Sequence, residues 1–309
     1  MRQIVAGTRK SNLALTQTDW VIDQLKQAGI TNDIQVEKIV TQGDRILNVT
    51  LSKVGGKALF VKEIEKAMFN KEIDMAVHSM KDVPSEMPEG LVITTIPVRE
   101  DHRDAWIAKD DIPLKDLPAG SIVGTSSLRR KAQILAERPD LEISWIRGNI
   151  ESRIRKLYEE DYDAIVLAVS GLKRVGLSEE LITEYLEPDV CVPSVGQGAL
   201  AIECREEDYE LRDLLALIHD QETAQTVTAE RTLLKILEGS CSVPVGGHAR
   251  LENGDIHMTA FVGTTDGETL LRENVQGTDP EEVGAEAANK LIGRGAKDII
   301  EQIKEELDS

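Results

Sequence analysis

Hydrophobic positions along the first 220 residues follow two periods that alternate. Short apolar runs, each long enough for one strand, are followed by segments whose apolar residues lie three or four apart. The first pair is typical: residues 2–7 predict a strand, and an amphipathic helix is expected from Ser11 to Gly29. The same reasoning predicts strands at 34–40, 73–79 and 91–98, and a helix at 60–72. Such alternation favours mostly parallel sheets with helices on both faces.

A second alternating series begins after residue 105. It predicts strands at 121–124, 142–147 and 163–170, with helices at 125–138 and 149–160. The apolar run 199–204 then follows a stretch containing Pro and Gly, and we expect it to return to the first sheet. Residues 196–201, GQGALA, also match part of a dinucleotide-binding motif. They precede a strand, whereas that motif follows one, so we prefer a tight turn between domains.

After residue 220 the alternation gives way to blocks of one kind of element. Residues 221–239 predict a single helix that ends at Gly239. Three strand-like runs follow, with turn signals at Asn253-Gly254 and Asp266-Gly267, and helices run from Pro280 to the end. Strands followed by helices indicate a small α+β domain with an antiparallel sheet.

These patterns predict an α/β protein with two doubly wound domains and a small α+β C-terminal domain. The first domain is expected at 1–98 with 195–218, the second at 102–192 and the third at 222–309. The segment between the strand at 34–40 and the helix at 60–72 is long, contains glycine and is weakly periodic. It is either a mobile lid or a plain surface loop.

Charge and composition narrow the possible functions. The 309 residues include 36 Lys and Arg against 55 Asp and Glu, a net charge of −19, and aromatic residues make up only 3%. An acidic chain with few aromatics is a poor nucleic-acid binder. Without an apolar run of membrane-spanning length or a signal-like N-terminus, we expect a cytoplasmic protein with no membrane partner. The three cysteines and five histidines are widely spaced, so we expect no metal site and no disulfide framework.

Two junctions between a strand and a helix carry hydroxyl and cationic side chains together. They are Gly7–Ser11 and Gly124–Arg130. Helix capping would explain the hydroxyls, but the helix dipole opposes cations at an N-terminus. A bound carboxylate or phosphate explains both. The window 121–155 also holds seven basic and four acidic residues. A solvated helix face accounts for some of them, and a small polyanionic ligand fits the whole set better.

Two further places could carry chemistry. Lys81 and Asp82 follow the strand predicted at 73–79, and in an extended segment they would face different ways. They are either a surface pair or an anion-binding lysine beside a carboxylate that handles a proton or a cation. Cys241 lies in a loop of small residues, which indicates an accessible thiol. His248 is near in sequence, but nothing else supports a cysteine-hydrolase dyad.

Eight segments between residues 8 and 247 together resemble the porphobilinogen deaminase family: TRKSNLAL, KVGGKALFVKE, AVHSMKDVP, GTSSLRRKAQ, IRGNIESR, LAVSGLKR, VGQGALAIECR and EGSCSVPVG. AVHSMKDVP and GTSSLRR are long and unusual strings, so the match is specific. The chain has Asn12 where the family often has Pro, and Ser240 where it often has Gly. Neither position has a predicted chemical role.

The resemblance implies a transferase of tetrapyrrole, and hence haem, biosynthesis. The family links four porphobilinogen units head to tail into hydroxymethylbilane and releases ammonia at each step. Its reaction is primed by a dipyrromethane cofactor held through a thioether, which the resemblance places on Cys241. It assigns Asp82 as the catalytic carboxylate. It also implies three α/β domains, of which the first two resemble periplasmic binding proteins. We expect a monomer with porphobilinogen as its small-molecule substrate.

The resemblance also implies a set of residues that bind the carboxylates of the cofactor and the growing chain: Arg9, Ser11, Lys53, Lys81, Thr125, Ser127, Arg129, Arg130, Arg147, Arg153 and Arg174. Residues expected to line the cleft are Phe60, Ser79 and Gln197, and the loop 46–57 matches the family's lid. The alternative function is a non-catalytic binding protein for an anionic metabolite, built on the same two-lobed fold. Such a protein would need neither Cys241 nor Asp82, and an interaction scaffold would carry no ligand at all.

Overall fold

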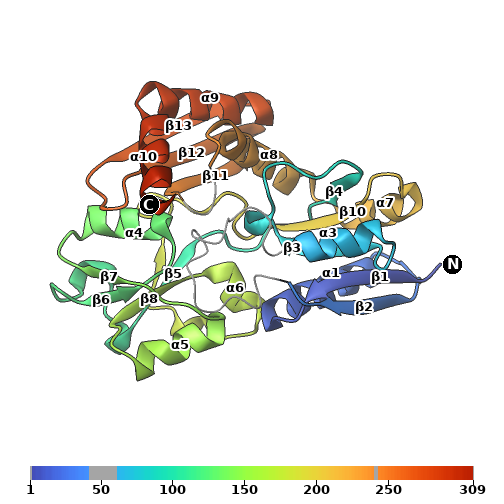
Figure 1. Ribbon diagram of the computed structural model, residues 1–309, viewed down its shortest axis with the longest axis horizontal. Coiled ribbons are helices and arrows are strands. Elements are labelled where there is room, and N and C mark those ends of the chain that lie inside the picture. The colour runs from blue at the N-terminus through green and yellow to red at the C-terminus, as the bar shows by residue number, and fades with distance from the viewer. Residues whose placement is uncertain (1, 42–60, 240–242, 309) are drawn as a thin grey trace. The chain divides into compact units, whose positions relative to one another are not determined.

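The computed structural model describes residues 2–41, 61–239 and 243–308, and it contains three separate sheets (Figure 1). The described residues fall into two compact units. The first unit holds 2–41, 61–100 and 199–224, and the second holds 101–198 with the described residues from 225 to 308. Among the described helices, none is long and apolar enough to cross a membrane.

The first unit is built on a five-stranded sheet in the order β2-β1-β3-β10-β4. Strand β10 is antiparallel to both of its neighbours, while β1 is parallel to β2 and β3. The run at 199–204 therefore does return to the first sheet, as predicted. The strands are Ile4–Arg9 (β1), Ile34–Ile39 (β2), Met75–Ser79 (β3), Leu91–Thr95 (β4) and Leu200–Arg205 (β10). The helices are Asn12–Gln27 (α1), Lys62–Phe69 (α3) and Tyr209–Leu215 (α7).

Alternate side chains of this sheet enter two apolar clusters. Val77 and Ile202 pack with Val21 of α1 in one cluster, and Ala76 packs with Ile64 of α3 in the other. Helices therefore cover both faces, as the periodicity predicts. One boundary differs, because Gly7 to Arg9 form the end of β1 and pair with Glu37 to Ile39 of β2. We expected these residues in the junction after the strand.

The second unit contains a five-stranded sheet in the order β7-β6-β8-β5-β9. Strand β5 is antiparallel to β8 and β9, and β6 is parallel to β7 and β8. The sequence did not predict β5 or β9, and the strand expected at 163–170 ends at Ala168, where a helix begins. The strands are Asp104–Ala108 (β5), Ile122–Gly124 (β6), Glu142–Ser144 (β7), Ala164–Ala168 (β8) and Glu184–Leu186 (β9). The helices are Leu128–Glu137 (α4), Ile150–Glu159 (α5) and Val169–Arg174 (α6).

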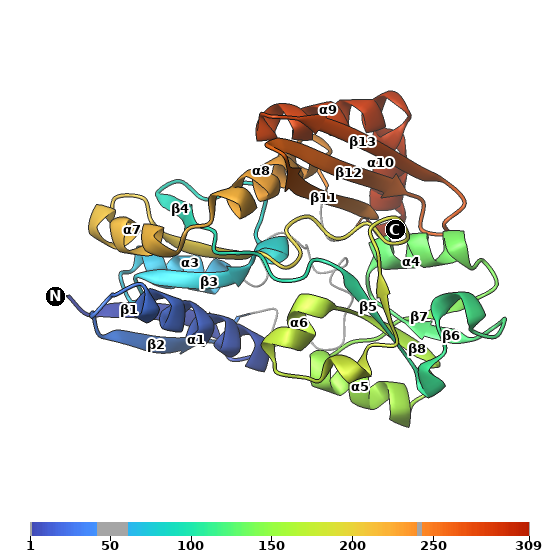
Figure 2. The ribbon, with the colours of Figure 1, turned by 180° about the vertical axis from the view of Figure 1, so that it is seen from behind.

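The C-terminal part of the second unit is the predicted antiparallel sheet with helices. Figures 1 and 2 show α9 along one face of that sheet, where Val283 and Leu291 enter its apolar cluster. Asn253 and Gly254 both have positive φ, 54° and 89°, as the predicted turn between β11 and β12 requires. The elements are Gln221–Ile236 (α8), Val245–Glu252 (β11), Asp255–Gly263 (β12), Leu270–Gly277 (β13), Pro280–Gly293 (α9) and Ala296–Asp308 (α10).

Short 3₁₀ turns complete the described chain. They are Met80–Asp82 (η2), Lys109–Asp111 (η3), Leu114–Asp116 (η4), Glu179–Leu181 (η5) and Ala216–Ile218 (η6). The first of these bears on the candidate site.

Candidate active site

One edge of the first sheet brings several predicted residues together. Because β1 and β3 are parallel neighbours, their carboxyl ends lie at the same edge, β1 ending at Arg9 and β3 at Ser79. The Ser11 hydroxyl accepts a hydrogen bond from the Ala14 N–H at 3.3 Å and caps α1. The Gln17 amide of α1 donates to the Ser79 hydroxyl at 2.9 Å. Helix α1 is thereby tied to the end of β3.

Asp82 lies in a tight turn at that edge and not in the extended segment that the sequence suggested. The Met80 N–H donates to the carbonyl of Ala199 at 3.0 Å, and the Val83 N–H closes the turn on the Met80 carbonyl. Met80 is buried, Lys81 is half-buried and Asp82 is exposed. The buried methionine and its backbone contact with the chain entering β10 end the strand. Asp82 is left with a solvent-accessible carboxylate at a fixed place.

In the second unit, Arg129 and Arg130 lie in the first turn of α4 and are almost fully buried. Both pair with Asp104 of β5: Arg129 Nη1 lies 2.8 Å from Oδ2, and Arg130 Nη2 lies 2.7 Å from Oδ1. Burial alone would raise the pKa of Asp104, but the two guanidinium groups hold it far below its usual range. Asp104 is not among the residues predicted from the sequence. The available signal was an acidic residue at the head of an otherwise apolar run, DAWIA.

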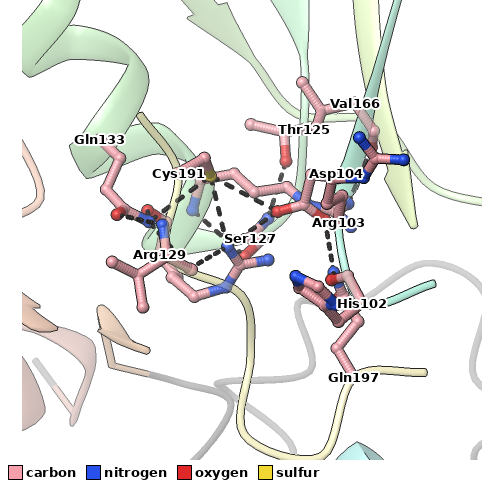
Figure 3. Close-up of polar contacts among 12 residues, drawn as sticks. His102, Arg103, Asp104, Thr125, Ser127, Arg129, Gln133, Val166, Cys191 and Gln197 are labelled. Atoms are coloured by element: carbon pink, nitrogen blue, oxygen red, sulfur yellow. Dashed lines mark hydrogen bonds and ion pairs between the residues drawn. The ribbon is translucent and has the colours of Figure 1, made fainter. Parts of the chain in front are cut away.

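Further donors converge on the same carboxylate (Figure 3). The Gln197 amide donates to Asp104 Oδ1 at 2.9 Å and to the His102 carbonyl at 2.8 Å. The Cys191 sulfur lies 3.4 Å from Oδ2, and burial raises the pKa of this thiol to about 12. Gln197 is thus placed beside the arginine pair, with no exposed surface.

The hydroxyls of the second junction act as caps and turn formers. The Ser127 hydroxyl accepts from the Arg130 N–H at 3.4 Å at the start of α4. The buried Thr125 hydroxyl accepts from the Ser127 N–H at 3.2 Å. Capping and turn formation therefore account for both hydroxyls, while the two cations beside them share Asp104 as their counterion.

Arg153 is close enough to Arg130 and Arg147 for mutual repulsion. Burial, and then the charges of Arg130 and Arg147, lower the pKa of Arg153 to about 10. The Arg153 Nε donates to the carbonyl of Gly148 at 2.8 Å. Arg174, at the end of α6, donates to the carbonyl of Gly198 at 2.7 Å. Guanidinium groups that repel one another at pH 7 fit a ligand that carries several carboxylates.

Three predicted residues and one predicted segment lie outside the described residues: Lys53, Phe60, Cys241 and the loop 46–57. His248, considered beside Cys241 as a dyad, lies in β11 and is buried. Its ring stacks on His102 with 3.7 Å between centroids, and its Nδ1 lies 3.6 Å from Glu230. Cys204, in β10, is buried.

Comparison with known proteins gives a consistent result over the whole chain. The family model described as porphobilinogen deaminase, dipyromethane cofactor binding domain, matches residues 4–213, and the model for the C-terminal domain of the same family matches residues 224–293. Porphobilinogen deaminase of Oceanobacillus iheyensis is 71% identical over 308 residues, with all of both chains covered. That of Halalkalibacterium halodurans is 59% identical over 310 residues, again with full coverage of both chains. The crystal structure of the methionine-binding protein MetQ is 12% identical, with a TM-score of 0.45 over 74% of this chain and 94% of that one.

Proposed function

The chain belongs to the porphobilinogen deaminase family, and we propose how its own residues carry out the family's reaction. The enzyme is a transferase of tetrapyrrole biosynthesis. It joins four porphobilinogen units into hydroxymethylbilane with release of ammonia, primed by a dipyrromethane cofactor. The alternative of a non-catalytic binding protein is not favoured, because relatives named for the enzyme match over the full chain.

We propose that Asp82 is the catalytic carboxylate. Loss of ammonia leaves positive charge on the methylene carbon of the substrate, and an anionic oxygen beside it lowers the energy of that state. The same carboxylate is able to accept the proton that the growing chain loses when the new carbon–carbon bond forms. The observation that carries this role is the exposure of Asp82 in a turn anchored to β10, at the sheet edge where Arg9 also lies.

The donors of the second unit suit the cofactor and the growing chain. When bound, the dipyrromethane would supply the pyrrole end to which the first unit is added. Every pyrrole carries an acetate and a propionate, so the ligand is a polyanion. The lowered pKa of Arg153 beside Arg130 and Arg147 is the observation that fits such a ligand. We propose that these residues bind carboxylates together with Arg9, Ser11, Lys53, Lys81, Thr125, Ser127, Arg129 and Arg174. Phe60, Ser79 and Gln197 would line the cleft, and 46–57 would form the lid.

We further propose that Cys241 bears the dipyrromethane through a thioether. The support is its place in a Gly, Ser and Pro loop that matches the family's attachment motif, EGSCSVPVG. The other two cysteines are buried, and burial raises the pKa of each thiol, so they are poor nucleophiles.

The organisation of the whole chain completes the proposal. We propose three domains, at 1–98 with 195–218, at 102–192 and at 222–309, each supported by a sheet of its own. We also propose that the enzyme is a monomer and acts in the cytoplasm.

Asp82→Asn tests the catalytic assignment. The amide keeps the size of the side chain but has no charge and cannot take up a proton at neutral pH. We expect normal folding and a normal cofactor content, with turnover reduced by about 10²–10⁴-fold. Turnover would be measured with porphobilinogen, and cofactor content by intact mass. Glu86→Gln removes an exposed charge four residues away and should leave turnover unchanged. Turnover of Asp82→Asn near that of the wild type would exclude the assigned role.

A further inference from the structure

A buried pair of polar side chains begins four residues before Asp82. His78 Nε2 of β3 is 2.8 Å from Glu203 Oε2 of β10, and the two side chains are 7% and 1% exposed. The antiparallel register pairs His78 with Ala201 and Ala76 with Glu203, so the two polar side chains are diagonal neighbours on one face of the sheet. Neither residue has a role in the proposed chemistry.

The surroundings of this pair are apolar and acidic. On the same face, Ala76 packs against Ile64 and Met68 of α3. Glu65 of α3 is a further charged group that interacts with both members of the pair. Burial, and then the charge of Glu203, raise the pKa of Glu65, while His78 and Lys62 act in the opposite direction. Among the residues that the structure describes, Glu203 Oε1 is buried without a hydrogen-bond partner.

Stability alone gives little reason for such a pair. Replacing both partners of a buried hydrogen bond by apolar side chains of similar shape is often nearly neutral or stabilising. A buried acceptor left without a partner adds a penalty. The pair therefore points to a requirement other than the stability of the fold.

The position of Glu203 in β10 indicates what this requirement is. The pairing of β10 with β4 shifts register between Ile202 and Glu203, an irregularity of the kind that re-aims a side chain. Just before β10, the Ala199 carbonyl accepts the N–H of Met80, the first residue of the Asp82 turn. The chain around β10 thus holds the end of β3 at two points: by its backbone at Met80 and by the Glu203 side chain at His78.

We propose that Glu203 is a positioning residue which, through His78, fixes the end of β3 and the turn that presents Asp82. The inference rests on the proposed role of Asp82. It implies that breaking the pair displaces the Asp82 carboxylate, while the bound cofactor stays in place.

The test compares single and paired substitutions. Glu203→Leu and His78→Leu each leave one buried polar partner and should lower the melting temperature and kcat. The double variant removes both partners. We expect the double variant to regain most of the lost melting temperature and to retain its dipyrromethane, as measured by intact mass. Its kcat should remain at least tenfold below that of the wild type, while its KM should stay within threefold. Glu203→Gln keeps an oxygen that accepts the His78 hydrogen bond and should restore kcat to within threefold of wild type.

A matched control lies at the opposite end of the same two strands. Arg205 of β10 pairs with Asp74, just before β3, at 2.7 Å. Asp74→Asn should lower the melting temperature without lowering kcat at a temperature where the protein is folded. If the double variant regained kcat together with stability, or if Glu203→Gln were as impaired as Glu203→Leu, the inference would be overturned. These outcomes differ from failure of the proposed function, in which Asp82→Asn itself stays active.

Discussion

Asp104 is the shared counterion of two buried arginines, Arg129 and Arg130. Arg129 also donates to the Val192 carbonyl at 2.7 Å, and Arg130 to the Val166 carbonyl at 2.7 Å. These guanidinium groups are therefore built into the interior of the second unit. Arg147 and Arg153 are more exposed. At the scale of single residues, the two groups of arginines should respond differently to substitution.

Single Arg→Leu changes should stop the enzyme at different stages. Changes at Arg129 or Arg130 leave Asp104 underpaired in the interior and should block cofactor assembly, giving apoprotein. Changes at Arg147, Arg153 or Arg174 remove bidentate contacts to carboxylates of the ligand. These variants should trap covalent intermediates with one to three extra rings. Native gels and mass spectra after brief exposure to porphobilinogen would show this. A uniform rise in KM in all five variants, without trapped species, would indicate a simple electrostatic funnel.

Cys191 makes the buried network sensitive to alkaline pH. The folded state raises the pKa of its thiol from 9.0 to about 12, so the folded protein keeps a proton that the unfolded chain loses. The contribution of this thiol to the free energy of unfolding is fully present below pH 9. It decreases as the pH rises from 9 towards 12, by at most about 1.4 kcal/mol per pH unit. The difference in unfolding free energy between wild type and Cys191→Ala should therefore shrink over this range in urea titrations. A difference independent of pH would contradict the burial of the thiol.

At the scale of elements, the start of α5 depends on Gly148. Its φ is +125°, and a Cβ there would overlap the Ser152 side chain. The carbonyl of Gly148 also accepts the Nε of Arg153. The Asn149 side chain then caps the helix by accepting from the Ser152 N–H at 2.9 Å. A backbone fixed by these contacts sets the direction of an arginine predicted to bind carboxylates.

Gly148→Ala should therefore lower the stability of the fold and also disturb the position of Arg153. We expect it to lower the free energy of unfolding by about 1–3 kcal/mol, the usual cost of a strained backbone conformation. It should also slow elongation. Gly120→Ala is the matched control, because Gly120 has φ +78° but open space around its Cβ position. Thermal unfolding and turnover of both variants would be compared, and equal effects would show that the contact with Ser152 is unimportant.

The sequence predicted α1 and α5 from an apolar and a polar face, and it predicted β8 and β10 from continuous apolar runs. It missed β5, whose four apolar residues directly follow a charged segment and were assigned to that segment, and it missed β9, a three-residue strand that begins with a charged residue. In the site, Asp82 and the arginines belong to local motifs. Asp104 and Glu203 do not, because each acts through a partner far away in the chain: Arg130 is 26 residues from Asp104, and His78 is 125 residues from Glu203. Only the fold brings such residues together.

At the scale of the whole molecule, the two α/β sheets share one arrangement. In each, the fourth strand in spatial order is antiparallel to its neighbours: β10 in the first sheet and β5 in the second. Both strands carry an acidic residue that pairs with a cationic or histidine side chain beside the predicted site residues, Glu203 with His78 and Asp104 with the arginines. The reversed strand therefore supplies the buried carboxylate of the pair in each sheet.

The mass of the intact protein tests the central claim, which is a covalent dipyrromethane on Cys241. The mass of the purified wild type should exceed its sequence mass by one dipyrromethane. Brief exposure to porphobilinogen should then add one, two or three further pyrrole rings. Cys241→Ser should lack the adduct and turn over no substrate, while Cys204→Ala should retain both adduct and turnover. A wild type that is unmodified and fully active would contradict the account.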